Sequence, residues 1–492
     1  KTRGRVLERA VCYFVVEWSI MHLLITKTGL LKVLCVFTLC FAQGFAIFGH
    51  GTGYRHMMKE FASMADIGRT RSVARKWIEQ PLDHFNKKET RTWKMRYFEN
   101  LEYFKPNGPI YLFIGGESET SPLSLQIGTM FELAKETNGA MFASEHRYYG
   151  RSMPLPFNVT ENLKFLSSRQ ALADLEKMIQ SLKSEMKTSK VVVVGGSYPG
   201  NLAAWAKQMY PKIIDAAIAS SAPVLAKKDF YEYLEVTSND YKQYGLSGCW
   251  EKISEIFTRY QSLLKTNEGI EQLKREENIC SFNDMTVLEN QQRFFDLKIE
   301  KFAIHSQYGT PKEIQEHCKE IMNSSRIATS LEILDDQQNC NDYSFRKMID
   351  DMKKKANELC WMYQTCTEFG YYQTTDSKSP FTQSVNLDYY IKTCSALFGP
   401  DFDEKTVDNG VERTNAQYHG LKPDVKHVVF ANGDMDPWHR LGVLKDLSDE
   451  APAIVIHGTS HCVDLHSKDV PEELRKARVY EKNLIKKWIG VN

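Results

Sequence analysis

The chain has 492 residues, of which 42% are hydrophobic and 25% charged, and its formal net charge is +1. That length and composition allow a large packed core and roughly two to four domains. The near-zero net charge gives no electrostatic reason to expect a nucleic acid or an anionic membrane surface as a partner.

Residues 1–46 are predicted to be a leader that is absent from the mature fold. From Met21, the first methionine, two basic residues, Lys27 and Lys32, precede the apolar run Val33–Phe41, and small residues follow. That order is typical of a secretory signal peptide. A membrane anchor is the alternative, but the apolar run is shorter than the roughly 20 residues that a membrane span needs.

Residues 47–224 are predicted to form the first part of an α/β domain. Apolar runs alternate with an amphipathic helix, whose apolar positions recur every three or four residues between Ser167 and Met186. Strands that alternate with helices indicate a parallel sheet covered on both faces. The strands are expected within the runs at 109–118, 139–150, 191–194 and 215–224.

The pattern changes after residue 224. Residues 225–417 are polar and largely helical, and the α/β pattern resumes over residues 418–492 with the runs "KHVVFANGDMDPW" and "APAIVIHGTSHC". The predicted architecture is one α/β domain interrupted by a helical cap insertion. Because the insertion holds most of the cysteines, we expect it to bear disulfides.

Eight of the 11 cysteines lie beyond the leader, seven in the insertion and Cys462 in the second α/β part. An even count downstream of a signal peptide predicts disulfides in an oxidising compartment. Full pairing would join Cys462 to an insertion cysteine, and we favour this over two buried thiols. The sequons at Asn158 and Asn323 would carry glycans in a secreted chain. The cysteine spacing lacks paired C-x-x-C units, so no metal site is expected.

A serine ends one predicted strand, in "VVVVGGSYPGNLAAW". Gly195 and Gly196 are small enough for a sharp turn into the next helix, which is the geometry of a nucleophile elbow. Ser197 is therefore predicted to be the nucleophile, and the backbone N–H of Tyr198 to be an oxyanion donor. Gly116, in the glycine loop after an earlier strand, is expected in the segment that supplies the second donor.

Pro199 stands where the elbow pattern G-x-S-x-G has its second glycine. Proline lacks an N–H, but it suits the first turn of a helix, where that N–H has no partner. Its expected cost is close packing, because a ring replaces a hydrogen.

A nucleophilic serine needs a base and an orienting carboxylate, which in this architecture follow in the order Ser, Asp, His after later strands. The run "VVFANGDMDPW" offers Asp434 and Asp436, and "IVIHGTSHC" offers His457 and His461, with His466 further on. His457 directly ends its strand and is interpreted as structural, whereas His461 lies far enough along the loop to reach back to the serine. The fold class is thus predicted to be an α/β-hydrolase with a helical, disulfide-bearing cap.

The motifs "EQPLDHFN", "SEHRYYGRS", "SSRQALADL", "GGSYPG", "NGDMDPW" and "SHCVDL" fall in the order of a known family. The chain resembles the serine carboxypeptidase family of lysosomal Pro-X carboxypeptidase, dipeptidyl peptidase II and thymus-specific serine protease. The insertion segment "WMYQTCTEFGYYQTT" is most similar to the thymus-specific branch. The resemblance covers roughly residues 75–490. It implies the triad Ser197, Asp436 and His461, and a secreted or lysosomal location.

The family resemblance implies a serine exopeptidase that cleaves short peptides. Cleavage after proline, and release of a dipeptide or of a single C-terminal residue, stay open. The alternatives are an esterase or lipase of the same fold and a catalytically silent binding protein. The intact triad argues against the latter and the family-like insertion against the former. No cofactor is expected, since H-E-x-x-H, G-x-G-x-x-G and P-loop motifs are missing; a homodimer is left open.

The insertion is expected to select the substrate, because insertions of this fold sit over the strand ends where the triad lies. The Glu368 carboxylate is predicted to pair with the ammonium group of a peptide, and Tyr371 to contact an apolar side chain. The alternative is that Glu368 lies on the surface and Tyr371 in the core of the cap.

Overall fold

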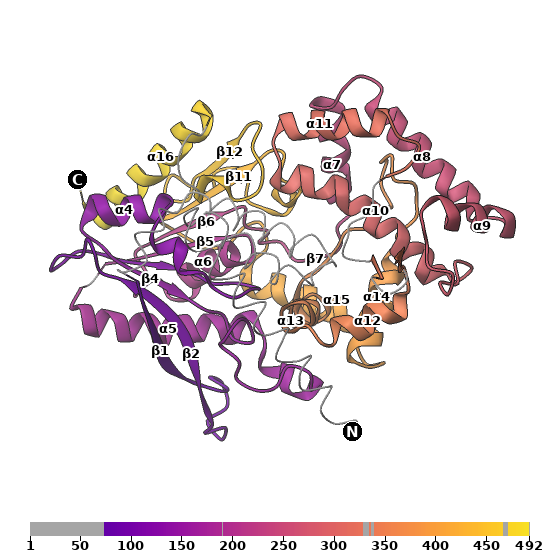
Figure 1. The fold of residues 1–492 in the computed structure, drawn as a ribbon. Helices are drawn as coiled ribbons and strands as arrows, with labels where there is room; N and C mark the ends of the chain where they lie inside the picture. Colours follow the sequence, from indigo (N-terminus) through magenta and orange to yellow (C-terminus); the bar gives the residue numbers. More distant parts are fainter. Residues whose placement is uncertain (1–72, 189, 328–333, 336–338, 466–470, 492) are drawn as a thin grey trace, which may run out of the picture. The chain divides into compact units, whose positions relative to one another are not determined.

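An eight-stranded mixed sheet forms the core of the α/β part of the chain, with the strand order β1-β2-β4-β3-β5-β6-β11-β12 (Figure 1). The computed structural model describes residues 73–188, 190–327, 334–335, 339–465 and 471–491. These residues belong to one compact unit. The predicted leader, residues 1–46, lies outside the described residues. None of the helices in the described ranges is both long and apolar enough to cross a membrane.

The sheet begins with an antiparallel hairpin and continues as a parallel α/β sheet, which confirms the predicted fold class. Strand β2 pairs antiparallel with both β1 and β4, and the other neighbours pair in parallel. The strands are β1 (Val73–Pro81), β2 (Thr92–Asn100), β3 (Ile110–Phe113), β4 (Ala140–Ser144), β5 (Val191–Gly196), β6 (Ala216–Ser220), β11 (Val428–Gly433) and β12 (Ala453–Ile456).

Helices cover both faces of the sheet, as the alternation of strands and helices predicts. Side chains of α4 (Thr129–Thr137) and α16 (Glu472–Ile489) pack in one cluster with Val192 and Val194 of β5. Because successive strand residues face opposite sides, Val191 and Val193 point to the other layer, where α5 (Ser168–Met186) packs against α6 (Tyr198–Met209). All four valines are fully buried.

A helical cap follows β6 and ends before β11, in the region predicted for the insertion (Figure 1). A short parallel pair of strands, β7 (Lys227–Asp229) and β10 (Gly370–Tyr372), lies at its base. A second small pair joins β8 (Leu334–Asp335) and β9 (Cys340–Asn341). The cap helices are α7 (Glu232–Gln243), α8 (Cys249–Leu263), α9 (Asn267–Glu276), α10 (Leu288–Tyr308), α11 (Pro311–Met322), α12 (Phe345–Met352), α13 (Ala356–Gln364), α14 (Leu387–Phe398) and α15 (Glu404–Tyr418).

The cap is cross-linked by disulfides, as predicted, but Cys462 takes no part in them. The bonds are Cys249–Cys318, Cys280–Cys340 and Cys366–Cys394. Cys360 and Cys462 are buried free thiols, so the favoured pairing of Cys462 with the cap is wrong. The reason is the orientation of the Cys462 side chain. Its Sγ faces β5, where a β-carbon on Gly196 would lie only 2.8 Å from it.

Candidate active site

The turn from β5 into α6 holds Ser197 in a strained backbone conformation, with φ 64° and ψ −135°. Non-glycine residues rarely adopt positive φ, and such strain persists where the surroundings fix the backbone. The neighbouring glycines are required by close contacts. A β-carbon on Gly195 would lie 2.0 Å from the Pro199 carbonyl oxygen, and one on Gly200 would lie 2.7 Å from the Ser220 carbonyl oxygen. This geometry is that of a nucleophile elbow.

Pro199 is accommodated because the loop after β3 has a glycine opposite it. A β-carbon on Gly116 would lie 2.4 Å from Cγ and 2.7 Å from Cδ of the proline ring. The ring therefore fills the space that a side chain at Gly116 would need. The contact also brings the predicted second oxyanion segment against the start of α6.

The N–H of Tyr198 is at the first turn of α6 and donates no hydrogen bond to any described residue. Helix N-termini carry unsatisfied N–H groups and a partial positive charge. An N–H in this position, next to Ser197, can stabilise a negative oxygen that forms on a substrate carbonyl.

His461 and Asp436 form a buried pair after the last two strands. His461 Nδ1 lies 2.7 Å from Asp436 Oδ2, and the two residues are 4% and 0% exposed. Burial acts against the charged imidazolium, but the Asp436 carboxylate, with a smaller contribution from Cys462, raises the pKa of His461 well above its ordinary value. His461 Nε2 is buried and has no hydrogen-bond partner among the described residues.

A second acid–imidazole pair lies on the same loops but is exposed. His457 Nδ1 lies 2.9 Å from Asp434 Oδ2, and the His457 side chain is 81% exposed. The structure therefore buries Asp436 with His461, whereas Asp434 pairs with the exposed His457. The third candidate histidine, His466, lies outside the described residues.

The end of β6 connects the serine turn to the histidine loop. The Ser197 N–H donates to the Ser220 carbonyl oxygen at 2.9 Å. The Cys462 N–H donates to Ser221 Oγ at 2.9 Å, and Ser220 Oγ donates to Asp464 at 2.5 Å. Two adjacent serines thus fix both loops to one strand end.

The cap contacts the histidine directly through the end of α10. The His461 N–H donates to the Gln307 carbonyl oxygen at 2.8 Å. The Tyr308 ring lies edge-on to the imidazole, with ring centroids 5.7 Å apart. Sequence reasoning missed both residues, because a helix end carries no pattern that reveals such a contact.

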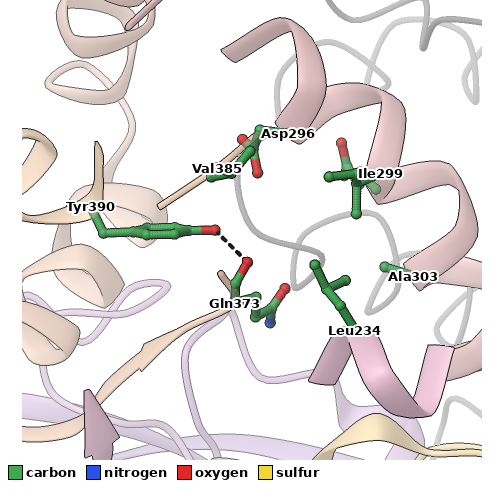
Figure 2. Close-up of a pocket in the computed structure, with 8 residues that line it drawn as sticks. Leu234, Asp296, Ile299, Ala303, Gln373, Val385 and Tyr390 are labelled. Carbon is green, nitrogen blue, oxygen red and sulfur yellow. Dashed lines mark hydrogen bonds between the residues drawn. The ribbon is translucent and has the colours of Figure 1, made fainter. Parts of the chain in front are cut away.

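A small pocket lies within the cap, between α7, α10 and α14 (Figure 2). Leu234, Ile299 and Val385 give it apolar walls, and Asp296 adds a carboxylate. The Tyr390 hydroxyl donates to the Gln373 carbonyl oxygen at 3.1 Å. Ser197, Asp436 and His461 do not line this pocket, so it is separate from the catalytic candidates.

The structure gives Glu368 and Tyr371 partners within the protein, in place of the predicted substrate contacts. The Glu368 carboxylate is buried and accepts hydrogen bonds from the N–H and Oγ of Ser168, at 2.9 and 2.8 Å, at the start of α5. Burial raises the pKa of Glu368. The Tyr371 hydroxyl donates to the Pro223 carbonyl oxygen, and its ring stacks on Phe369. Neither side chain is exposed to receive a peptide, which corrects the two predicted roles.

The two predicted glycan acceptors, Asn158 and Asn323, are both exposed. No group of three or more His, Cys, Asp or Glu side chains in the described part of the chain is arranged to hold a metal ion.

A serine elbow on β5, followed by a buried Asp–His pair after β11 and β12, defines the protein as an α/β-hydrolase with a serine-hydrolase site. The fold is therefore of the predicted class. Comparison with known sequences then identifies the branch. The chain belongs to the serine carboxypeptidase S28 family, whose model matches residues 80–480.

The relatives are serine peptidases. The thymus-specific serine protease of Mus musculus is 33% identical over 420 residues, covering 79% of this chain and 82% of the relative. Its counterpart from Homo sapiens is 31% identical, covering 83% and 84%. The lysosomal Pro-X carboxypeptidase of Bos taurus is 28% identical, covering 84% and 88%. The predicted resemblance and the prediction of a serine-type exopeptidase are confirmed.

Proposed function

We propose that Ser197, His461 and Asp436 hydrolyse peptides through an acyl-enzyme. Ser197 Oγ attacks the scissile carbonyl while His461 Nε2 takes its proton, and the imidazolium then gives that proton to the leaving amine. Water, deprotonated by the same nitrogen, releases the acyl group and restores Ser197. In the neutral imidazole, which is the form present above the raised pKa of His461, Asp436 holds the proton on Nδ1, so that Nε2 is the basic nitrogen.

The observation that carries this proposal is the buried 2.7 Å contact between His461 Nδ1 and Asp436, with Nε2 left without a partner among the described residues. An imidazole fixed at one nitrogen and available at the other is what a serine nucleophile requires. We assign the oxyanion to the Tyr198 N–H and to a backbone N–H near Gly116. The Gly116–Pro199 contact supports this assignment.

The substrates we propose are short peptides with one free terminus. The cap supports this, because the end of α10 contacts His461 and restricts the approach to it. The name of the bovine relative, a Pro-X carboxypeptidase, makes proline before the scissile bond the first specificity to examine. Profiling with a mixed peptide library tells release of one C-terminal residue from release of an N-terminal dipeptide.

Substitution of the nucleophile tests the mechanism. Ser197→Ala should lower kcat by several orders of magnitude. A fluorophosphonate probe should label wild-type protein at Ser197 and leave Ser197→Ala unlabelled. Ser324→Ala, which changes a serine outside the site, is the control. Near-normal peptidase activity of Ser197→Ala, or labelling at another serine, would refute the assignment.

We also propose that the protein works in the secretory route or the lysosome. The three cap disulfides support an oxidising folding compartment, and the exposed sequons support glycosylation. Expression in a eukaryotic host should yield protein whose mass falls on deglycosylation, and Asn158→Gln with Asn323→Gln should abolish that shift. A mass that glycosidase leaves unchanged would contradict the proposal.

A further inference from the structure

The side chain of Tyr198, next to the elbow serine, is held by a buried hydrogen-bond chain that crosses from the α/β domain into the cap. Gln364, the last residue of α13, donates from Nε2 to the Tyr198 hydroxyl oxygen at 3.0 Å. The Tyr149 hydroxyl donates to Gln364 Oε1 at 2.6 Å. His146 Nε2 lies 3.0 Å from the Tyr198 hydroxyl. We call these four residues, His146, Tyr149, Tyr198 and Gln364, the Tyr198 network.

The donor and the acceptor of each hydrogen bond in the Tyr198 network can be assigned by starting from His146, where the network ends. His146 Nδ1 lies 2.7 Å from the Arg147 carbonyl oxygen, which can only accept, so Nδ1 carries the proton. Burial lowers the pKa of His146 to about 4, so the ring is neutral above that pH and Nε2 accepts from the Tyr198 O–H. The Tyr198 oxygen is then free to accept from Gln364.

The network is enclosed, so a lost bond is not replaced by water. Gln364 and Tyr149 are 0% exposed, Tyr198 is 1% exposed and His146 is 5% exposed. Aromatic side chains of the cap complete the enclosure: the Tyr198 ring centroid lies 5.7 Å from that of Trp361 and 5.4 Å from that of Phe369.

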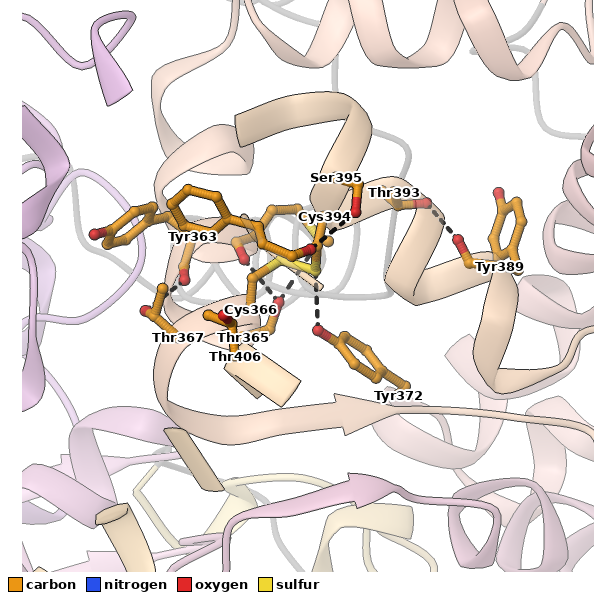
Figure 3. The surroundings of a disulfide bond; sticks show 12 residues. Tyr363, Thr365, Cys366, Thr367, Tyr372, Tyr389, Thr393, Cys394, Ser395 and Thr406 are labelled. Carbon is orange, nitrogen blue, oxygen red and sulfur yellow. Dashed lines mark hydrogen bonds between the residues drawn. A yellow bond between two sulfur atoms is a disulfide. The ribbon is translucent and has the colours of Figure 1, made fainter. Parts of the chain in front are cut away.

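The cap segment that carries Gln364 is itself fixed. A π-helical turn, Thr365–Phe369, follows α13 directly. The Cys366–Cys394 bond ties that turn to α14, and Tyr372 contacts the Cys394 sulfur at 3.1 Å (Figure 3). Glu368 in the same turn is bonded to the start of α5. Gln364 is therefore presented to Tyr198 by a rigid element.

We infer that Gln364 is a positioning residue for catalysis, which acts through the Tyr198 hydroxyl to hold the Tyr198 peptide N–H toward the oxyanion. Ser197 has an unfavourable backbone conformation that its surroundings must maintain. Anchoring the next side chain on two sides prevents the Ser197–Tyr198 peptide from rotating to a relaxed geometry. The cap thereby completes the oxyanion site as well as limiting access. This inference rests on the proposed function, in which the Tyr198 N–H is an oxyanion donor.

The test compares ground-state with transition-state binding. Gln364→Leu removes the amide from the network and should lower kcat about 10- to 100-fold, within the range for an impaired oxyanion donor, with KM nearly unchanged. A peptide boronic acid built on the best library substrate, whose boron adduct presents an oxygen to the oxyanion site, should lose affinity by a similar factor. The matching peptide product should bind as before.

Further variants distinguish a positioning role of Gln364 from a general loss of structure in the cap. Tyr198→Phe removes the hydroxyl, and because both changes break the same bond, Tyr198→Phe with Gln364→Leu should cost little more than either alone. Gln364→Glu can donate to Tyr198 only while its carboxyl is protonated, so its kcat relative to wild type should fall as pH rises. Gln292→Leu makes the same change at a buried cap glutamine, bonded to Asn386 at 2.9 Å, and should keep kcat.

A kcat of Gln364→Leu within about twofold of wild type, or an equal loss of boronate and product affinity, would overturn the inference. Activity that persists in Ser197→Ala would instead refute the proposed triad. If Ser197→Ala is inactive and Gln364→Leu keeps its kcat, only the positioning role fails. Thermal unfolding of each variant establishes that the protein compared is folded.

Discussion

The Pro199 ring occupies the space that a side chain at Gly116 would need, since a β-carbon on the glycine would lie 2.4 Å from the ring. In this chain, a proline at the fifth position of the elbow therefore requires a residue without a side chain at position 116, in the loop after β3. This contact explains how the chain carries a proline where G-x-S-x-G has a glycine.

Gly116→Ala should displace either the loop or the start of α6, and a displacement of about 1 Å at a catalytic centre can cost about 100-fold in rate. We expect kcat to fall about 10- to 100-fold. Adding Pro199→Gly removes the ring and should restore most of the loss, whereas Pro199→Gly alone should cost less than Gly116→Ala. Steady-state kinetics of the three variants measure this. A double variant as slow as Gly116→Ala would contradict the explanation that the Pro199 ring excludes a side chain at position 116.

Asp436→Asn should lower kcat about 10⁴-fold, because an amide that donates to Nδ1 leaves the proton on Nε2, where the serine proton must go. The matched control is Asp434→Asn, which makes the same change in the exposed pair with His457. We expect kcat of the control to stay within a few-fold of wild type. The opposite ranking of the two variants would transfer the catalytic role to Asp434.

Two buried carboxyls behind the histidine loop should lower the stability of the protein as pH rises through and above neutrality. Burial raises the pKa of Asp464 to about 6 and that of Glu481 well above its ordinary value, with the Asp464 charge adding to the shift at Glu481. Both Glu481 oxygens lack a hydrogen-bond partner among the described residues. The nearby Ser220 hydroxyl and Arg478 guanidinium favour the charged form of Asp464, but they offset only part of the effect of burial on its pKa.

A carboxyl with a raised folded pKa binds its proton more tightly in the folded state, so its contribution to stability is lost as pH rises through that pKa. For Asp464 the contribution is lost between roughly pH 4 and 6. Glu481 extends the loss to higher pH. His146, whose pKa is lowered to about 4, acts in the opposite direction only below about pH 6.5.

Asp240, whose pKa burial raises to about 8, and His461, whose pKa is also raised, contribute a loss of stability in the same direction between pH 6.5 and 8.5. Because they contribute equally to wild type and to Glu481→Gln, the difference between these two proteins in thermal unfolding over this range measures the effect of Glu481. We expect Tm to fall as pH rises, and Glu481→Gln, which cannot ionise, to flatten the dependence. An unchanged slope in Glu481→Gln would show that Glu481 does not contribute to the dependence of stability on pH.

Cys360 and Cys462 should be recovered as thiols. Peptide mapping after alkylation in denaturant without reductant should find both modified, and the other six cysteines of the described residues in three disulfides. Alkylation of the native protein should be slow at both, because both side chains are buried. Recovery of Cys462 in a disulfide-linked peptide would contradict the structure.

The parallel strands could be predicted from sequence because their residues are buried on both faces. The Val191–Val194 run, for example, is apolar throughout and ends in two glycines. The hairpin of β1 and β2 was not predicted as strands. Its first strand has mixed exposure along its length, so polar residues such as Arg75 and Lys76 interrupt the apolar pattern. The pairing that stabilises it is between segments, and neither segment reveals it alone.

The candidate triad could be predicted because its residues occur in the order Ser, Asp, His and each follows the end of a predicted strand. Gln364 could not, because a buried amide that bonds to two tyrosine hydroxyls has the same sequence signature as a surface glutamine. The prediction for Glu368 was wrong for a related reason. A charged residue among aromatic residues suggested a substrate-binding site, but its partner is the start of a helix 200 residues earlier. Cys462 could not be assigned by counting, because an even total is compatible with unpaired thiols.

The bond between Glu368 and Ser168 has a consequence for how the chain folds. The first turn of α5 receives a carboxylate from the cap, across 200 residues of sequence. During synthesis from the N-terminus, α5 emerges long before residue 368 exists, so its first turn remains incomplete until the cap has been made and docked. Such long-range closure slows folding and couples the two parts into one cooperative step. A truncated chain that ends before the cap would leave the Ser168 N–H without this acceptor, and it would also lack Asp436 and His461.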